Sequence, residues 1–511
     1  MQVTIDGGPL ALNQVVAVAE RRATVTVDHS VWARMAPARQ VVEGAVARDE
    51  IVYGITTGFG ALANTRIDPE EAEALQVQLL RSHAAGVGDP IPDELVRAML
   101  LLRARTLAQG HSGVRPVVVE RLVELLRADL LPVVPGQGSV GASGDLAAFA
   151  HLALPVIGEG SLQDAGRVVP AAEALARHGM APIHLRAKEG LSLLNGTEGM
   201  LAMGVLGHHR AMRLARAADI ACALSVEVLL GSARPFRPEI HALRPHPGQV
   251  VAARNVARLL EGSPIGASHH HDFTHAVQDA YSLRCAPQVH GACRDTFAFV
   301  AEVLSRELGS VVDNPIVLPE TGEVISAGNF HGQPLAFALD YLAIVTTELG
   351  SISERRTDRM LDPERSAGLP AFLSPRPGVN SGYMLTQYTA AALVAENRVL
   401  SHPASVESIP TSGSQEDHVS MGWGAGRKLS EVLRNTARVL AVEVLCAVQG
   451  IEYRRPLEPA PGTGAVARTV REVVPPLGED RVVSGEIEAV AEMIENGSLV
   501  AAAEEAVGEL G

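Results

Sequence analysis

Residues Ala142, Ser143 and Gly144 have the types and the order that a tripeptide needs to cyclise on itself. In this reaction the glycine amide nitrogen attacks the alanine carbonyl carbon, two waters leave, and the serine Cβ becomes a methylidene carbon. The product, 4-methylidene-imidazol-5-one, is an electrophile that no ordinary side chain provides. Gly144 suits the reaction because its nitrogen is unhindered and its backbone tolerates tight geometry. A flexible loop of small residues is the alternative interpretation, because short motifs also arise by chance.

Two other segments carry polar groups that could serve such an electrophile. Tyr53 stands directly before a glycine-rich stretch, residues 54–60, which we expect to be a mobile loop. A phenol there can act as a general base if its surroundings lower its pKa, and a half-buried structural tyrosine is the alternative. Asn195 and Gly196 interrupt an apolar helical stretch, so the Asn195 amide is available to hydrogen-bond a ring carbonyl.

Gln278, Tyr281 and Arg284 are spaced i, i+3 and i+6, which places them on roughly one face of a helix. An arginine on such a face can hold a carboxylate through two parallel hydrogen bonds. The three residues are therefore candidates for substrate binding, and a solvated helix face is the alternative.

Three further motifs suggest different chemistry. Residues 136–141 fit Gly-x-Gly-x-x-Gly, but they lack the surrounding alternation of strands and helices that a dinucleotide site requires. Residues 110–113 resemble a nucleophile elbow, yet Val114 stands where its last glycine belongs. The run from His269 to His275 could bind a metal, and a metal-dependent hydrolase built on it is the alternative from another class. We interpret this run as a solvated surface loop.

The elements that position these residues are predicted to be mainly helical. Hydrophobic residues make up 47% of the chain and aromatic residues only 3%, a composition that favours helix over sheet. Leucines at helical spacing predict helices within residues 335–349 and 429–440, and residues 191–230 are apolar on several faces. Short strands are expected at residues 2–5, 23–27 and 167–170. The predicted fold class is mostly α.

The chain of 511 residues exceeds the usual size of one domain. We expect a smaller mixed domain over residues 1–215, which carries the Ala142-Ser143-Gly144 loop. A long-helix bundle with a C-terminal helical appendage is expected over residues 216–511.

The net charge, the cysteines and the N-terminal residues exclude several classes of partner, of cysteine site and of cellular location. A net charge of −15 without long blocks of one sign argues against nucleic acid or an anionic membrane as the main partner. Four cysteines without a Cys-x-x-Cys pair argue against a disulfide framework or a zinc ribbon. Residues 1–22 lack the basic start and apolar core of a signal peptide, and no apolar run approaches membrane-spanning length. We therefore expect a cytoplasmic protein.

Taken together, the motifs resemble the aromatic amino-acid ammonia-lyase family, and within it most closely the bacterial histidases. The resemblance rests on segments that follow one another in the family's order: residues 53–60, 81–86, 138–146, 195–197, 277–284, 328–332 and 408–422. It implies a mostly helical, histidase-like fold and a homotetramer whose active sites combine residues of more than one subunit. It also implies the cyclised Ala142-Ser143-Gly144 group, with no metal or diffusible cofactor.

The resemblance implies a role for each candidate residue. The substrate α-amine would attack the methylidene carbon derived from Ser143, Tyr53 would remove a β-proton, and ammonia would leave to give an α,β-unsaturated acid. The other implied roles are carboxylate binding by Arg284, positioning of the amine or ring carbonyl by Asn195 and Gln278, contact with the electrophile by Tyr281, assistance to cyclisation by Asp145, and packing against electrophile and substrate by Phe330.

The polar residues His83 and Glu416 favour histidine as the substrate. Phenylalanine-type lyases resemble this chain around Ser82 and His83 but carry an apolar pair there, and a hydrogen-bonding site discriminates strongly against rings that cannot pair with it. Glu416 can pair with an imidazole or take part in proton transfer. We therefore expect deamination of L-histidine to trans-urocanate and ammonia. The alternatives are a tyrosine ammonia-lyase or aminomutase, since Ser82 and His83 also resemble bacterial tyrosine aminomutases, and a catalytically inactive relative.

Overall fold

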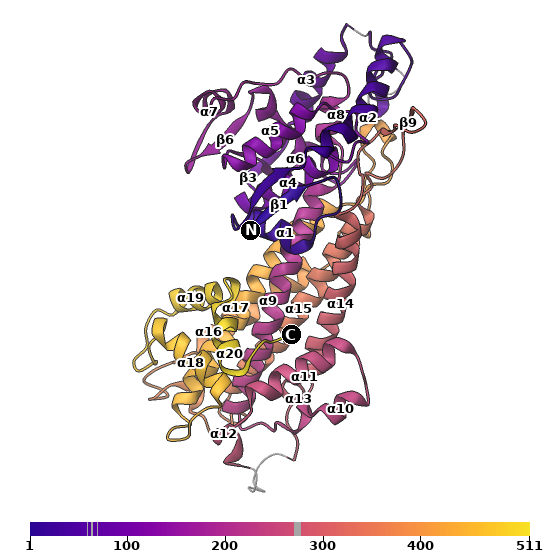
Figure 1. Ribbon diagram of the computed structural model, residues 1–511. Helices are drawn as coiled ribbons and strands as arrows, with labels where there is room; N and C mark the ends of the chain where they lie inside the picture. Colours follow the sequence, from indigo (N-terminus) through magenta and orange to yellow (C-terminus); the bar gives the residue numbers. More distant parts are fainter. Residues whose placement is uncertain (59, 63–64, 69, 270–276) are drawn as a thin grey trace. The chain divides into compact units, whose positions relative to one another are not determined.

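The structure is a computed structural model that describes residues 1–511 except 59, 63–64, 69 and 270–276 (Figure 1). The chain divides into two compact units. The first unit consists of Met1–Leu206, Ala301–Asp340 and Pro403–Arg427, and the second of Gly207–Val300, Tyr341–His402 and Lys428–Gly511. Four of the five boundaries fall within α9 (Glu198–Val228), α14 (Ala286–Glu307), α15 (Gln333–Leu361) and α17 (Gly422–Glu452), and the fifth lies between His402 and Pro403, outside any helix. Since compactness does not establish independent folding, the expected division into two domains at residue 215 stays a prediction.

A small parallel sheet begins the first unit. β1 (Gln2–Ile5) pairs with β2 (Thr24–Val27), with Gln2 opposite Thr24 and Ile5 opposite Val27. Helix α1 (Leu12–Ala19) makes the crossover that a parallel pair requires. Val3 and Ile5 are buried, whereas the residues that alternate with them are exposed. Both strands confirm the sequence predictions.

The other strands form short antiparallel sheets. β3 (Val87–Pro90) pairs with β5 (Pro135–Gln137), and β8 (Ile316–Leu318) pairs with β9 (Glu323–Ile325). A three-stranded sheet has the order β4 (Leu131–Pro132), β6 (Ser161–Asp164), β7 (Arg167–Pro170), and β7 confirms the last predicted strand. β5 belongs to an antiparallel pair, so residues 136–141 lack the parallel βαβ unit of a dinucleotide site. Instead, β5 leads the chain directly into the loop that carries Ser143.

Helix α4 (Asp93–Leu107) is a long and almost completely buried helix of the first unit. It packs against α1 and α5 (Pro116–Arg127), and all of its residues from Leu95 to Leu107 are buried. Three arginines are among them, and a buried charge requires hydrogen-bonding partners. The other helices of this unit are α2 (Ser30–Ala47), α3 (Ala72–His83), α6 (Leu146–Ala153), α7 (Ala171–Arg177) and α8 (Glu189–Leu194).

The second unit is a bundle of long helices, as the sequence predicts. Within it, His208 of α9 hydrogen-bonds the Phe297 carbonyl of α14 at 3.1 Å, and the Thr436 hydroxyl of α17 donates to the Thr346 carbonyl of α15 at 3.3 Å. The shorter helices are α10 (Pro238–Ala242), α11 (Pro247–Leu259), α12 (Pro264–Ala267), α13 (Tyr281–Arg284), α16 (Met384–Leu400), α18 (Pro461–Val473), α19 (Ser484–Glu495) and α20 (Ser498–Val507). The mostly α fold class is therefore confirmed.

Helix α15 is, among the described residues, the one helix with the length and apolar composition needed to cross a membrane. Of its most apolar 18-residue window, 67% is buried inside the protein. Burial of this kind is the packing of a core helix, which is apolar on most of its faces.

The cysteines behave as small buried hydrophobic residues. Cys222, Cys293 and Cys446 are buried and Cys285 is half-buried, and all four are free thiols. Burial raises the pKa of the Cys222, Cys293 and Cys446 thiols to about 12, so they stay protonated and unreactive near neutral pH.

Candidate active site

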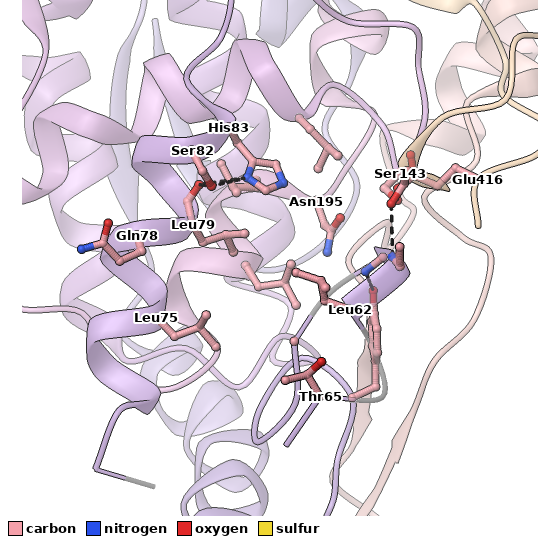
Figure 2. A pocket seen from close by; sticks show the side chains of 18 of the residues that line it. Leu62, Thr65, Leu75, Gln78, Leu79, Ser82, His83, Ser143, Asn195 and Glu416 are labelled. Carbon is pink, nitrogen blue, oxygen red and sulfur yellow. Dashed lines mark hydrogen bonds between the residues drawn. The ribbon is translucent and has the colours of Figure 1, made fainter. Parts of the chain in front are cut away.

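A cavity of about 660 Å³ in the first unit brings together five of the residues singled out from the sequence. Its walls come from described residues between Tyr53 and Ile67, helix α3, the loop before α6, helix α8 with the turn that follows it, and residues 412–416. Figure 2 shows the side chains that surround the space. The candidate residues that line it are Tyr53, His83, Ser143, Asn195 and Glu416.

Ser143 and Glu416 meet at one wall of the cavity (Figure 2). The Ser143 hydroxyl donates a hydrogen bond to Glu416 Oε1 at 3.3 Å. The other carboxylate oxygen, Oε2, accepts a hydrogen bond from the Thr411 hydroxyl at 2.8 Å, so Thr411 orients the carboxylate. Residues more than 270 positions apart in the sequence thus make a direct contact, and the sequence pattern contained no sign of Thr411.

His83 is the last residue of α3, and its ring orientation is fixed by the same helix. Its Nδ1 lies 3.0 Å from the Leu79 carbonyl oxygen, which can only accept, so Nδ1 carries the hydrogen. Burial lowers the pKa of His83, although the Glu416 carboxylate opposes the shift. The ring is therefore neutral near pH 7, and its Nε2 can accept a hydrogen bond from a ligand.

Tyr53 also lines the cavity, and its phenol is protonated. Its hydroxyl oxygen accepts a hydrogen bond from the Gly60 amide at 3.4 Å. Burial raises the pKa of Tyr53, and the negative charge of Glu416 raises it further. The lowered pKa that base catalysis requires is therefore not found in the single chain.

The turn between α8 and α9 supplies Asn195, as the break in the apolar stretch predicts. Asn195 is 4% exposed, and its amide nitrogen donates to the Asn314 carbonyl at 2.7 Å. This hydrogen bond fixes the side chain and leaves its carbonyl oxygen as an acceptor.

The backbone of the Ala142-Ser143-Gly144 tripeptide is held by the turn at Gly196. The Gly196 carbonyl accepts the Asp145 amide at 2.9 Å, and the Gly196 amide donates to the Ser143 carbonyl at 3.4 Å. Gly144 has a φ of +82°, and a Cβ there would lie 2.0 Å from the Gly196 oxygen, so only glycine fits. In the described part of the structure the Gly144 amide donates no hydrogen bond, and its nitrogen is therefore available for attack on Ala142. The tripeptide geometry fits a cyclised prosthetic group.

Asp145 follows the tripeptide and is fully buried. Its carboxylate accepts hydrogen bonds from the Met200 amide at 2.8 Å and from the Ser139 hydroxyl at 3.4 Å. Burial raises the pKa of Asp145 to about 7, because these hydrogen bonds and the nearby arginine Arg103 only partly offset its desolvation. A carboxyl group with this pKa can both give and take a proton near neutral pH.

The candidate residues Gln278, Tyr281 and Arg284 belong to the second unit. Tyr281 is 69% exposed, and the Arg284 guanidinium lies over its ring at 4.7 Å from the ring centroid. Arg284 Nε donates to the Asp279 carbonyl at 2.9 Å. Helix α13 begins at Tyr281, so Gln278 precedes the helix and the predicted single helical face over the three residues is wrong. The sequence spacing was correct for Tyr281 and Arg284 alone.

Two remaining predictions lie outside the cavity. Phe330 is half-buried in the turn between β9 and α15, and it is not among the described residues that line the cavity. Of the histidine run, residues 270–276 fall outside the described residues, and the described part contains no group of three potential metal ligands.

Besides Thr411, sequence reasoning missed a buried ion pair next to the site. Arg103 on α4 forms an ion pair with Glu198 at 2.7 Å, and both side chains are almost completely buried behind the Asn195-Gly196 turn. The available signal was an arginine within a helix whose neighbours are nearly all apolar.

Comparison with known proteins places this site in a family. The family described as aromatic amino acid lyase matches residues 10–472. A histidine ammonia-lyase of Gloeobacter violaceus is 52% identical, with 99% of this chain and 98% of that protein covered, and one of Symbiobacterium thermophilum is 53% identical, with 99% of each covered.

Solved structures of similar fold cover nearly the whole chain as well. A histidine ammonia-lyase from Trypanosoma cruzi is 42% identical, with a TM-score of 0.91 and coverage of 100% of this chain and 96% of that one. A tyrosine aminomutase from Streptomyces globisporus is 40% identical, with a TM-score of 0.94 and complete coverage of both chains. With the family match spanning most of the chain and relatives covering nearly all of it, the chain belongs to the aromatic amino acid lyase family.

Proposed function

We propose that this protein deaminates L-histidine to trans-urocanate and ammonia through a 4-methylidene-imidazol-5-one group formed from Ala142, Ser143 and Gly144. The observation that carries the proposal is one cavity lined by a neutral His83, by Ser143 and by the Glu416 carboxylate that contacts Ser143. Relatives at about half identity that are histidine ammonia-lyases support the same substrate. The prosthetic group, when formed, supplies an electrophilic carbon that makes the substrate amine a better leaving group.

The residues around the cavity suit an imidazole substrate. His83 Nε2 accepts a hydrogen bond from a ring N–H, and Glu416 pairs with a ring that carries a proton. Asn195 holds the amine or the ring carbonyl. Phe330 does not line the cavity of the single chain, so in this proposal it packs against a substrate bound in a site shared between subunits.

Tyr53 is the proposed general base for the substrate β-proton. Its raised pKa in the single chain means that the role requires a positive charge near the phenol. The substrate ammonium group or an arginine of another subunit provides such a charge. The phenolate then forms only when substrate is in place.

We further propose a cytoplasmic homotetramer with shared active sites. Gln278, Tyr281 and Arg284 then bind the substrate in the cavity of a partner subunit. The exposure of Tyr281 in the single chain supports this assignment, because an exposed aromatic side chain is available for contact with another subunit.

Purified protein should convert L-histidine to urocanate, which is followed by its ultraviolet absorbance. If the protein left histidine unchanged but formed coumarate or β-tyrosine from tyrosine, the proposed substrate would be wrong and tyrosine would take its place. If activity required a metal and was lost to a chelator, the hydrolase alternative would gain support instead.

The Ser143→Ala variant tests the prosthetic group itself. Turnover should fall below detection with the fold intact, because no methylidene carbon can form without the serine hydroxyl. Mass spectrometry of the peptide that spans residues 138–146 should show the loss of two waters in the wild type and not in the variant. Ser112→Ala is a control for the loss of a serine hydroxyl in the same unit, because Ser112 lies outside the cavity and its hydroxyl lacks a hydrogen-bond partner within the described residues. Near-normal activity of Ser143→Ala would overturn the mechanism.

A further inference from the structure

A buried ion pair lies directly behind the turn that holds the tripeptide. Arg103 is 0% exposed, and its Nη2 lies 2.7 Å from Glu198 Oε2. Its Nη1 donates to the Asn195 carbonyl at 2.5 Å and to the Ser192 carbonyl at 3.3 Å. The guanidinium therefore binds the end of α8, the turn and the start of α9 at once.

The pair packs against Gly196, which hydrogen-bonds the backbone of the tripeptide segment. Gly196 has a φ of +147°, and a Cβ on it would lie 2.2 Å from Glu198 Oε2 and 2.4 Å from Arg103 Nη2. On its other side, Gly196 hydrogen-bonds both the Ser143 carbonyl and the Asp145 amide. The turn is thus fixed between the ion pair and the tripeptide.

Arg103 also contacts the helix that follows the tripeptide. Its guanidinium carbon lies 4.3 Å from the centroid of the Phe149 ring, and Phe149 belongs to α6, which begins at Leu146. The same cation therefore positions the turn beside the tripeptide and the helix after it.

Cyclisation depends on this position because it needs two backbone groups in contact. The Gly144 nitrogen bonds to the Ala142 carbonyl carbon, and the first water takes the Ala142 oxygen and the hydrogens of the Gly144 and Ser143 nitrogens. The second water takes the Ser143 hydroxyl and the Ser143 Cα hydrogen, which leaves the Cα=Cβ double bond. No external oxidant or reductant takes part. As the Cα hydrogen leaves as a proton, negative charge develops on the Ser143 carbonyl oxygen, to which the Gly196 amide donates.

We propose that Arg103, together with Glu198, is a positioning residue for formation of the prosthetic group. It acts through the Asn195 carbonyl and Gly196, which hold the tripeptide in a geometry ready to cyclise. This inference rests on the proposed function, since it assumes that the tripeptide cyclises.

The test is the fraction of the 138–146 peptide that has lost two waters. Arg103→Met, which keeps the length of the side chain but removes its charge and donors, should lower this fraction or the rate of its appearance at least about tenfold. Arg103→Lys should lie between Arg103→Met and the wild type, because an ammonium group keeps the charge without the planar fork. Arg105→Met is the matched control, because Arg105 lies on the same helix at 2% exposure and donates instead to the Gly8 and Ser310 carbonyls.

The outcomes separate this inference from the proposed function. If the wild-type peptide retained both waters, the proposed function itself would fail. A folded Arg103→Met protein that cyclises like the wild type would overturn the role of Arg103 alone, as would an equal loss in Arg105→Met. If Arg103→Met did not fold, Gly196→Ala would replace it, since the added Cβ displaces the turn from the ion pair while both charges remain.

Discussion

At the scale of single residues, burial shifts the pKa values around the cavity in a direction set by each group's charge. Desolvation keeps His83 neutral and Tyr53 protonated, and it raises the pKa of Asp145 to about 7. Glu416 contributes its charge to the shifts of both His83 and Tyr53. A substrate that enters the cavity meets an uncharged imidazole beside a carboxylate, an arrangement suited to a polar ring.

The His83→Leu variant tests this arrangement. We expect kcat/KM for histidine to fall about ten- to hundredfold, because a ring N–H left without its acceptor is unsatisfied in a buried site. The loss for tyrosine should be smaller. His178→Leu is a suitable control, because His178 lies in the same unit and pairs with Asp164 rather than lining the cavity. Equal losses for both substrates would show that His83 does not select the ring.

The Asp145→Asn variant tests whether the pKa of Asp145 is raised, because a raised pKa makes the free energy of unfolding depend on pH. The native state binds the Asp145 proton up to about pH 7, whereas the unfolded chain releases it near the ordinary value of 3.8. Between these values the native state holds more protons, so this group lowers the free energy of unfolding as pH rises. Relative to the wild type, the variant should gain about 3 kcal/mol of stability between pH 5 and pH 8, measured by urea unfolding. Parallel pH profiles for the two proteins would contradict the shift.

At the scale of elements, the tripeptide loop is fixed from two directions. The turn at Gly196 holds one side, and the segment that enters α17 holds the other. There, Trp423 Nε1 donates to the Gly136 carbonyl at 2.9 Å, and the Ser420 hydroxyl donates to the Gly141 carbonyl at 3.2 Å. The glycines of this loop are therefore constrained by close contacts as well as by their backbone angles.

A pair of glycine substitutions separates the effect of close contacts from the effect of the backbone angle. Gly141 has a φ of +68°, and a Cβ there would lie 2.2 Å from the Ser420 hydroxyl, whereas Gly166 has a φ of +78° with nothing within 4 Å. Gly166→Ala should cost about 1 kcal/mol of stability from backbone strain and keep full activity. Gly141→Ala should cost more and lower both activity and the cyclised fraction, as measured by thermal unfolding, urocanate formation and peptide mass. Equal effects of the two substitutions would mean that contacts in the loop do not matter.

At the scale of the whole molecule, the proposed active site draws on more than one chain. Ser143 and Glu416 contact each other within the first unit of one chain, while Arg284 belongs to the second unit. If Arg284 serves a partner's cavity, two inactive variants can restore a complete site between them.

Co-expression of Ser143→Ala with Arg284→Met should therefore restore activity to about a quarter of the wild type, since random mixing in a symmetric oligomer leaves that share of sites intact. Ser143→Ala with Glu416→Ala should restore none, because one chain must supply both residues. Urocanate formation by the co-purified proteins measures both pairs. Absence of activity from the first pair would place Arg284 and Ser143 in the same chain's site.

The sequence by itself pointed to the proposed chemistry, the mostly helical fold class and several of the elements. Ala142, Ser143 and Gly144 have the residue types that the proposed cyclisation needs, and the break at Asn195 follows from polar residues within an apolar stretch. Leucine spacing predicted parts of α15 and α17, because helical periodicity is a local property. The helical face over Gln278 was wrong since spacing alone does not show where a short helix begins.

Tertiary structure alone decided how these residues act on one another. The contact of Glu416 with Ser143, the support of the Gly196 turn by Arg103, and the raised pKa values of Tyr53 and Asp145 all depend on burial between segments far apart in the chain. Desolvation and hydrogen-bond geometry are set by three-dimensional packing, and a linear pattern contains neither.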